Sequence, residues 1–170
     1  MVYSDYKSNK RFFQTAAARV WLVKEEIQPI KWNIIQDLDS IILEQPVQKA
    51  MAQYRGRTYE ARFAPEIASP YGPWKMQGLP GLILSVRTLD GYFSSDAVKL
   101  INNTKKHAIT NPYAALSVRT LQEFKKDLRE HYLFLAKNAA AKNPDGGTYK
   151  INFFGDQLED FDIDAVDFEY

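Results

Sequence analysis

The sequence predicts a mostly β protein of the α+β class, in which antiparallel strands are combined with one long helix near the C-terminus. Aromatic residues make up 14% of the 170 residues, and these large flat side chains suit pleated sheets. Several segments alternate between apolar and polar residues on either side of a short turn, as the arms of hairpins do. One segment, which begins at Thr120, has the apolar spacing of an amphipathic helix.

The length and composition limit the class of protein. A chain of 170 residues suits one domain with a real core, here residues 1–170. The net charge of +1 gives no reason to expect nucleic acid as a partner, and the absence of cysteine excludes disulfides, thiolate nucleophiles and cysteine-bound zinc. The sequence shows no apolar run long enough for a transmembrane segment and no signal peptide at its start. We expect no cofactor and no bound metal.

The first third of the chain is expected to form strands. Residues 2–14 place aromatic side chains on both sides of a polar turn, which predicts a hairpin. Residues 16–26 contain alanines that favour a helix, but the valines around Trp21 favour a strand, and we predict a strand. Residues 31–36 alternate like a strand, and residues 37–40 are interpreted as a turn.

Two hairpins are predicted in the middle of the chain. Residues 47–55 and 57–64 alternate with period two on either side of Gly56, which supplies a tight reversal. Residues 82–89 and 92–101 flank an Asp-Gly pair, which is a strong hairpin signal. In the first of these hairpins, the second arm should point Tyr59, Ala61 and Phe63 toward the core. Glu60 and Arg62 should point toward water or a partner.

The helix is predicted to begin at Thr120 because Thr120 and Glu123 have the spacing of a capping box. Its apolar residues recur in steps of three and four, so one face should lie on the sheet. The Asn-Pro-Asp-Gly-Gly segment at 143–147 ends it. Residues 148–154 and 161–170 then predict two late strands.

The segment 71–84 contains three glycines, two prolines and a tryptophan before an aliphatic run. Such alternation predicts one bent backbone path that leads into a strand and forms a bend at the sheet edge, and its spacing does not match the glycine-rich patterns that bind phosphate. If Gly78 or Gly81 has positive φ, valine at that position should destabilise the fold, whereas Lys75→Ala should do little. The residues of this corner are Gly72, Pro73, Trp74, Gly78, Leu79, Pro80 and Gly81.

Gly72-Pro73-Trp74-Lys75 and Gly78-Leu79-Pro80-Gly81-Leu82-Ile83-Leu84 resemble the motif of the GLPGLI family, proteins of unknown function from Bacteroidetes. Other segments look like family positions in family order, namely Trp32-Asn33-Ile34, Gln48-Lys49-Ala50, Arg55-Gly56-Arg57-Thr58-Tyr59, Phe63-Ala64-Pro65-Glu66-Ile67 and Asp90-Gly91-Tyr92. The family is similar to the bowl-like N-terminal domain of a bacterial peptide-N-glycosidase. The resemblance therefore implies a curved antiparallel sheet, a bowl or half-barrel, and an accessory role.

The resemblance also implies a periplasmic or cell-envelope location, because family members usually carry a signal peptide. Members are usually longer, so we expect the domain of residues 1–170 to lack N-terminal strands of the full family length. Val47 stands where members commonly have a cysteine. The resemblance assigns no catalytic residue.

Candidate reactive groups are few. The two histidines are His107 and His131, and a helix-surface role is favoured for His131 because no second metal ligand follows one turn later. The acidic residues near the C-terminus are Asp156, Glu159, Asp160, Asp162, Asp164, Asp167 and Glu169. A solvated strand face is favoured over a calcium site there, because Ala165 stands where an EF-hand loop needs glycine.

The candidate binding residues are Trp32, Tyr54, Tyr59, Arg62, Tyr71 and Trp74. Aromatic side chains beside a few polar groups can line a peptide or carbohydrate site, but packing in the core of a curved sheet is the favoured alternative. For Arg55, Arg57 and Arg62, a paired cross-strand ladder that faces solvent is favoured over an anion or partner site. We expect a non-catalytic binding or accessory module for an envelope protein or a glycan. The alternatives are a hydrolase that uses carboxylates and, as a weaker reading, a calcium-stabilised structural domain.

Overall fold

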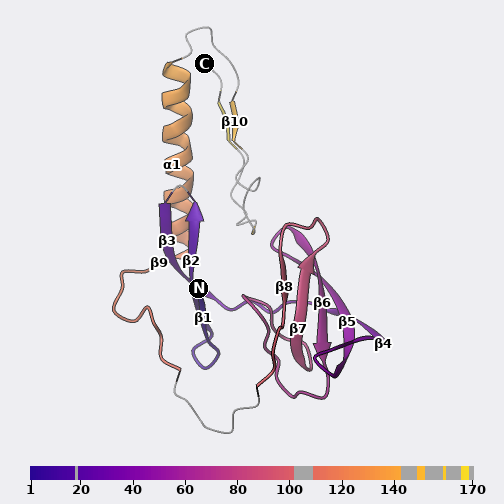
Figure 1. Cartoon of the computed structure of the whole chain (residues 1–170). Helices are drawn as coiled ribbons and strands as arrows, with labels where there is room; N and C mark the ends of the chain where they lie inside the picture. The colour runs from indigo at the N-terminus through magenta and orange to yellow at the C-terminus, as the bar shows by residue number, and fades with distance from the viewer. Residues whose placement is uncertain (18, 102–108, 143–148, 152–158, 160–165, 169–170) are drawn as a thin grey trace. The chain divides into compact units, whose positions relative to one another are not determined.

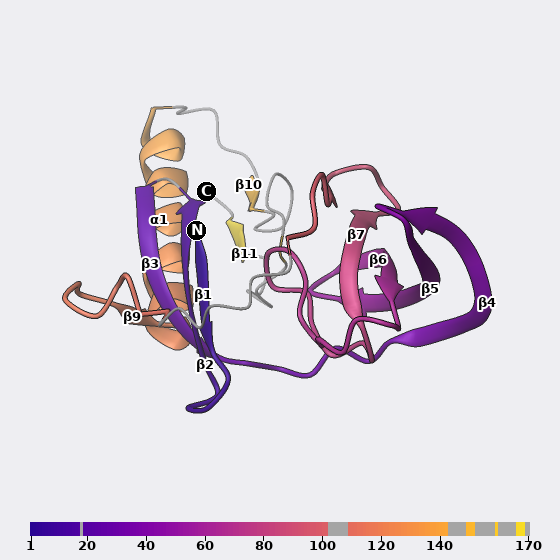
Figure 2. The same cartoon turned by 60° about the horizontal axis from the view of Figure 1, so that its bottom comes forward.

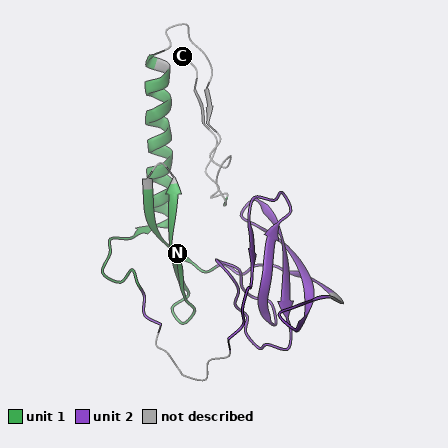
Figure 3. Cartoon of the chain, in the orientation of Figure 1, with its two compact units in different colours: residues 1–27, 112–170 green, residues 28–111 purple. Residues whose placement is uncertain are grey.

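The computed structural model describes residues 1–17, 19–101, 109–142, 149–151, 159 and 166–168. The chain divides into two compact units (Figure 3): Met1–Ile27 with Pro112–Tyr170 form unit 1, and Gln28–Asn111 form unit 2. The described residues are mostly β, with curved antiparallel sheets and one helix, so the predicted fold class is confirmed. The organisation of residues 1–170 as a single domain stays a prediction.

Unit 1 contains a four-stranded sheet in the order β1-β2-β3-β9 (Figure 1). The hairpin of β1 (Val2–Asp5) and β2 (Lys10–Ala17) and the strand β3 (Arg19–Glu26) confirm the predicted strands at the start of the chain. The short β9 (Arg119–Thr120) pairs in parallel with β3. The side chains of Phe13, Trp21 and Val23 on this sheet pack against α1 (Leu121–Ala141).

The helix α1 begins as predicted, at a capping box. Glu123 Oε2 accepts hydrogen bonds from the backbone N–H of Thr120 at 2.7 Å and from its hydroxyl at 2.9 Å, and the N–H of Glu123 donates to Thr120 Oγ1 at 3.2 Å. Two donors that a helix start leaves unpaired are satisfied in this way. The helix and the sheet share a core, which consists of Phe13, Trp21, Val23, Phe124 and Leu128, with Val2, Leu121 and Tyr132 at its border.

Two short strands near the C-terminus, β10 (Tyr149–Ile151) and β11 (Val166–Phe168), pair in antiparallel fashion. They lie within the two late strands that the sequence predicts. The rest of those segments lies outside the described residues, as do His107, the helix-ending segment 143–147 and most of the acidic residues near the C-terminus.

Unit 2 is an antiparallel five-stranded sheet in the order β4-β5-β6-β7-β8, and Figure 2 shows the strong curvature of β4 and β5. Its strands are β4 (Asn33–Ile42), β5 (Gln45–Tyr54), β6 (Arg57–Ala64), β7 (Leu82–Thr88) and β8 (Ser94–Asp96). Both predicted central hairpins are confirmed, although the second arm of the second hairpin is only three residues long.

The turn predicted at residues 37–40 is wrong, because β4 runs through it. The pairing of β4 with β5 shifts register between Ile35 and Leu38 and again between Leu38 and Ser40. Such irregularities let a strand bend and continue, so the polar residues lie in a bulged strand. The reversal occurs instead at Leu43 and Glu44, which have φ of 50° and 65°. Neither residue type is typical of positive φ, which explains why no turn signal stands at these positions.

The sequence predicts one sheet that carries both the helix and the glycine-rich corner, but the two belong to different units. The helix lies on the sheet of unit 1, and the corner belongs to unit 2, where it contributes to a separate core. Hairpin patterns predict which neighbouring strands pair, but they contain no information about which hairpins share a sheet.

Candidate functional site

The corner segment covers one face of the sheet in unit 2. Lys75, Met76 and Leu79 are each 1% exposed, and Met76 and Leu79 pack in a core with strand residues such as Tyr59, Ala61 and Phe63. This core face of β6 is the one that the sequence predicts. The irregular backbone is held by hydrogen bonds from Gly78 N to the oxygen of Pro70 at 2.8 Å and from Met76 N to that of Pro73 at 3.1 Å.

Two glycines of the corner are required for different reasons. Gly78 has φ of 90°, so the expected positive φ is found at that residue. Gly81 is required by close packing, because an added Cβ would lie 2.2 Å from the carbonyl oxygen of Ala64. The expectation for Lys75→Ala is not supported by the burial of Lys75, whose ammonium nitrogen lies 5.5 Å from the centre of the Trp74 ring.

Four of the six candidate binding residues lie in or against the core of unit 2. Tyr54 and Tyr59 are buried, and the ring of Trp74 stacks on Tyr59 with centroids 6.3 Å apart and an interplanar angle of 25°. Trp32 packs against the same core, and its indole N–H donates to the carbonyl oxygen of Gln77 at 2.8 Å. These contacts match the alternative in which the aromatic residues fill the core.

Arg62 lies on the opposite face of β6 from Tyr59. Its guanidinium donates to Glu60 Oε1 at 2.8 Å, and Arg87 of the neighbouring strand reaches the same oxygen at 2.8 Å. Glu60 is buried although the sequence places it toward water or a partner. One carboxylate thus holds two arginines in a cross-strand ladder, as expected for paired arginines.

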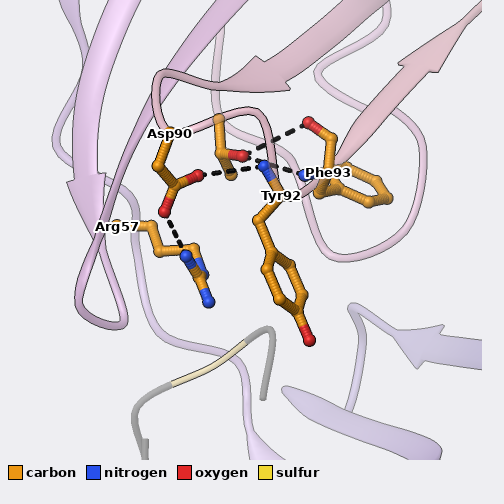
Figure 4. Close-up of polar contacts among 5 residues, drawn as sticks. Arg57, Asp90, Tyr92 and Phe93 are labelled. Atoms are coloured by element: carbon orange, nitrogen blue, oxygen red, sulfur yellow. Dashed lines mark hydrogen bonds and ion pairs between the residues drawn. The ribbon is translucent and has the colours of Figure 1, made fainter. Parts of the chain in front are cut away.

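An ion pair connects the turns of the two central hairpins (Figure 4). Arg57 forms an ion pair with Asp90, and its guanidinium carbon lies 4.0 Å from the centre of the Tyr92 ring. Hydrogen bonds from the Thr88 side chain and from the backbone N–H of Tyr92, together with Arg57, lower the pKa of Asp90. A carboxyl group that is kept ionised in a tight turn acts as a structural acceptor.

A groove of about 460 Å³ lies in unit 2 beside the start of β7. Of the candidate binding residues, only Tyr71 lines it. Its lining is mostly apolar and consists of Tyr71, Gly72, Pro73, Leu82, Ile83, Leu84 and the segment 95–100. Tyr71 also accepts a hydrogen bond from Ile83 N at 3.0 Å, so the corner forms one wall.

The other wall of the groove is β8 and the residues that follow it. Hydrogen bonds from Ala97 N to Leu84 O at 2.7 Å and from Thr88 N to Phe93 O at 2.8 Å turn the backbone of Phe93 and Ala97 toward β7. Because orientation alternates along an antiparallel strand, the backbone groups of Ser94 and Asp96 point to the other side, and Val98 follows two residues after the end of β8. No strand in the described ranges pairs with that side of β8.

The sequence predicts a strand here but does not show that it lies at a sheet edge. Only the strand order places it there. In the structure Val98 is 90% exposed, which the alternation of residues 92–101 does not predict.

In unit 1, a second pocket of about 490 Å³ lies at α1, lined by Trp21, Arg119, Asp127, Glu130, His131 and Phe134. Arg119 Nε pairs with Asp127 Oδ2 at 3.2 Å, and the His131 ring contacts Tyr132 edge-on at 5.8 Å. This helix-surface position is the one favoured for His131. Within the described residues, no group of three or more His, Asp or Glu side chains is placed to hold a metal ion.

The fold and the groove define a mostly β protein in which no described strand pairs with the outer side of β8. In comparisons with known proteins, no family model, no curated protein and no solved structure matches the chain. Among the described residues, none of the helical segments combines the length and the apolar character needed to cross a membrane.

Proposed function

We propose that this protein is a non-catalytic binding module that takes an extended segment of a partner protein along the outer edge of β8. The observation that carries the proposal is the unpaired side of β8, which lies beside the apolar groove. Main-chain groups at Ser94, Asp96 and Val98 would bond to the added strand, and the groove would accept one of its side chains. Strand addition of this kind derives affinity from the backbone and specificity from side-chain pockets.

A protein partner is favoured over a glycan because of the aromatic residues. Sugar sites commonly use exposed aromatic faces, whereas Tyr54 and Tyr59 are buried and Trp74 stacks on Tyr59. The groove lining is mostly aliphatic, which suits an apolar side chain. A hydrolase that uses carboxylates has less support, because Glu60 and Asp90 are both held in ion pairs.

The resemblance to the GLPGLI family adds an envelope location and an accessory role to this proposal. A partner would then be another envelope protein. Fractionation of the native cells with an antibody to the chain tests the location, and recovery in the cytoplasmic fraction alone would contradict it.

The binding proposal is tested by panning a displayed library of random octapeptides on the full chain. Val98→Pro removes the N–H that comes next in this alternation, two residues after Asp96, so it should block strand addition while the sheet remains intact. Enriched peptides should bind this variant at least about tenfold more weakly than the wild type, because main-chain bonds are lost. Val98→Ala keeps the N–H and serves as the control.

The fold of each variant is checked by circular dichroism. If no peptide is enriched, or if the enriched peptides bind Val98→Pro as well as they bind the wild type, the proposed function is wrong. A preference of the chain for glycans in an array, lost in Val98→Pro, would replace the protein partner with a sugar.

A further inference from the structure

The central residue of the open edge is acidic. Asp96 is exposed on β8, and its Oδ1 accepts a hydrogen bond from the hydroxyl of Ser85 at 2.6 Å. This bond fixes one oxygen of the carboxylate, and the second oxygen remains available to a ligand. No described cation lies within ion-pair distance of Asp96.

Arg62 and Arg87, the arginines on the same face of the sheet, pair with Glu60 and not with Asp96. Arg87 lies one row along β7, and both it and Arg62 reach Glu60 Oε1 at 2.8 Å. Glu60 lies on β6 in the interior of the sheet, whereas Asp96 lies on β8 at its edge. A cation that neutralises Asp96 is therefore best supplied by the strand added next to β8.

An apolar position follows on the same edge. Val98 is two residues beyond Asp96 and is 90% exposed. β8 ends at Asp96, and an added strand that continues along the chain past this point would place alternate residues beside Asp96 and Val98.

We propose that the partner segment carries lysine or arginine beside Asp96 and an aliphatic residue two positions away, beside Val98. This inference rests on the proposed function and specifies the chemistry of the partner. The pairing of opposite charges across neighbouring strands and the covering of Val98 fix the register of the added strand.

The test pans the same octapeptide library on the wild type and on Asp96→Lys. Wild-type peptides should be enriched in a basic residue two positions from an aliphatic one, and Asp96→Lys should select an acidic residue in place of the basic one. The best wild-type peptide should bind Asp96→Asn about threefold more weakly and Asp96→Lys about tenfold more weakly, measured by fluorescence anisotropy at low salt. Glu66→Lys makes the same change in net charge at an exposed residue that does not line the groove, and it should bind that peptide like the wild type.

The outcomes separate the two proposals. The charge rule is that a basic residue of the partner lies beside Asp96. If the enriched peptides lose binding to Val98→Pro but show no preference for a basic residue, or if Asp96→Lys selects the same basic residue, the charge rule is wrong and strand addition remains. Peptides that are indifferent to Val98→Pro overturn strand addition itself. Equal weakening by Glu66→Lys would assign the effect to net charge and would also overturn the charge rule.

Discussion

The two units cover their sheets in different ways. In unit 1 a regular helix packs on the sheet, whereas in unit 2 an irregular segment that contains Lys75, Met76 and Leu79 fills the equivalent place. A helix repeats its apolar side chains every turn, and no single residue fixes its backbone path. The corner has no repeat, so its path depends on individual glycines. We therefore expect unit 2 to be more sensitive to backbone substitutions in its cover, and unit 1 to depend on the contacts of its sheet.

The largest effect is expected in unit 1, at a buried ion pair between β2 and β3. Arg11 Nη1 and Glu25 Oε1 are 3.7 Å apart, and both side chains are 1% exposed. Arg11→Met leaves a carboxylate buried without this cation and should lower the free energy of unfolding by about 3–5 kcal/mol. Urea titration followed by circular dichroism at 222 nm, which reports on α1, measures the effect.

The neighbouring pair on the same strands is the matched control. Lys10 Nζ lies 2.9 Å from Glu26 Oε1, but the two side chains are 37% and 65% exposed, so Lys10→Met should cost no more than about 1 kcal/mol. Equal costs for the two variants would show that burial of the first pair does not decide its contribution. If tryptophan fluorescence and circular dichroism give coincident transitions, residues 1–170 unfold as the single domain that their length predicts.

The next effect is expected in unit 2, at the two glycines of the corner. Gly81→Val forces a side chain against the backbone of Ala64 and should destabilise by about 3 kcal/mol. Gly78→Val has open space and meets only the strain of positive φ, so it should cost about 1–2 kcal/mol. Urea unfolding measures both. A Gly78 variant that is less stable than the Gly81 variant would contradict the packing argument.

Lys75→Ala should have an intermediate effect. The side chain is buried beside the Trp74 ring, and its loss should cost about 1–2 kcal/mol because the packing of the stem and the cation–π contact are both removed. Lys99→Ala is the control, since Lys99 is exposed and its truncation should change stability by less than about 0.5 kcal/mol. Thermal unfolding compares them, and indistinguishable midpoints would refute the role of Lys75 in the core.

The smallest effect is expected at the helix cap in unit 1. Thr120→Ala removes one half of the capping box and should cost about 1 kcal/mol. Hydrogen bonds from the backbone N–H and then the hydroxyl of Thr120 lower the pKa of Glu123 below 4.5. Because the folded-state pKa is the lower one, this stabilisation is present above pH 4.5 and is lost as the pH falls through the folded-state pKa.

Glu123→Gln separates the charge from the cap. Glutamine can accept the same hydrogen bonds but does not titrate, so the variant should lose less stability than the wild type when the pH falls from about 7 to about 3. Helix signal in thermal unfolding at the two pH values measures the difference. Parallel losses in the two proteins would mean that the ionisation of Glu123 does not contribute.

Local features of the fold were predictable. The Gly56 and Asp-Gly turns, the hairpin of residues 2–14 and the capping box at Thr120 depend on neighbours within a few residues, and all are found. The prediction of a turn at residues 37–40 was wrong because a bulged strand can contain polar residues when a long partner strand lies beside it. The burial of Lys75 and Glu60 was missed because their partners are distant in the sequence or depend on strand register.

By itself, the sequence determined the fold class, most of the strands and the start of the helix, because these follow from side-chain periodicity and from hydrogen bonds between near neighbours. Only the tertiary structure decided that the strands separate into different sheets, that the corner covers the sheet of unit 2, and that β8 is an edge beside an apolar groove. Strand order depends on which apolar faces pack together across the whole unit, and a local pattern does not contain that information.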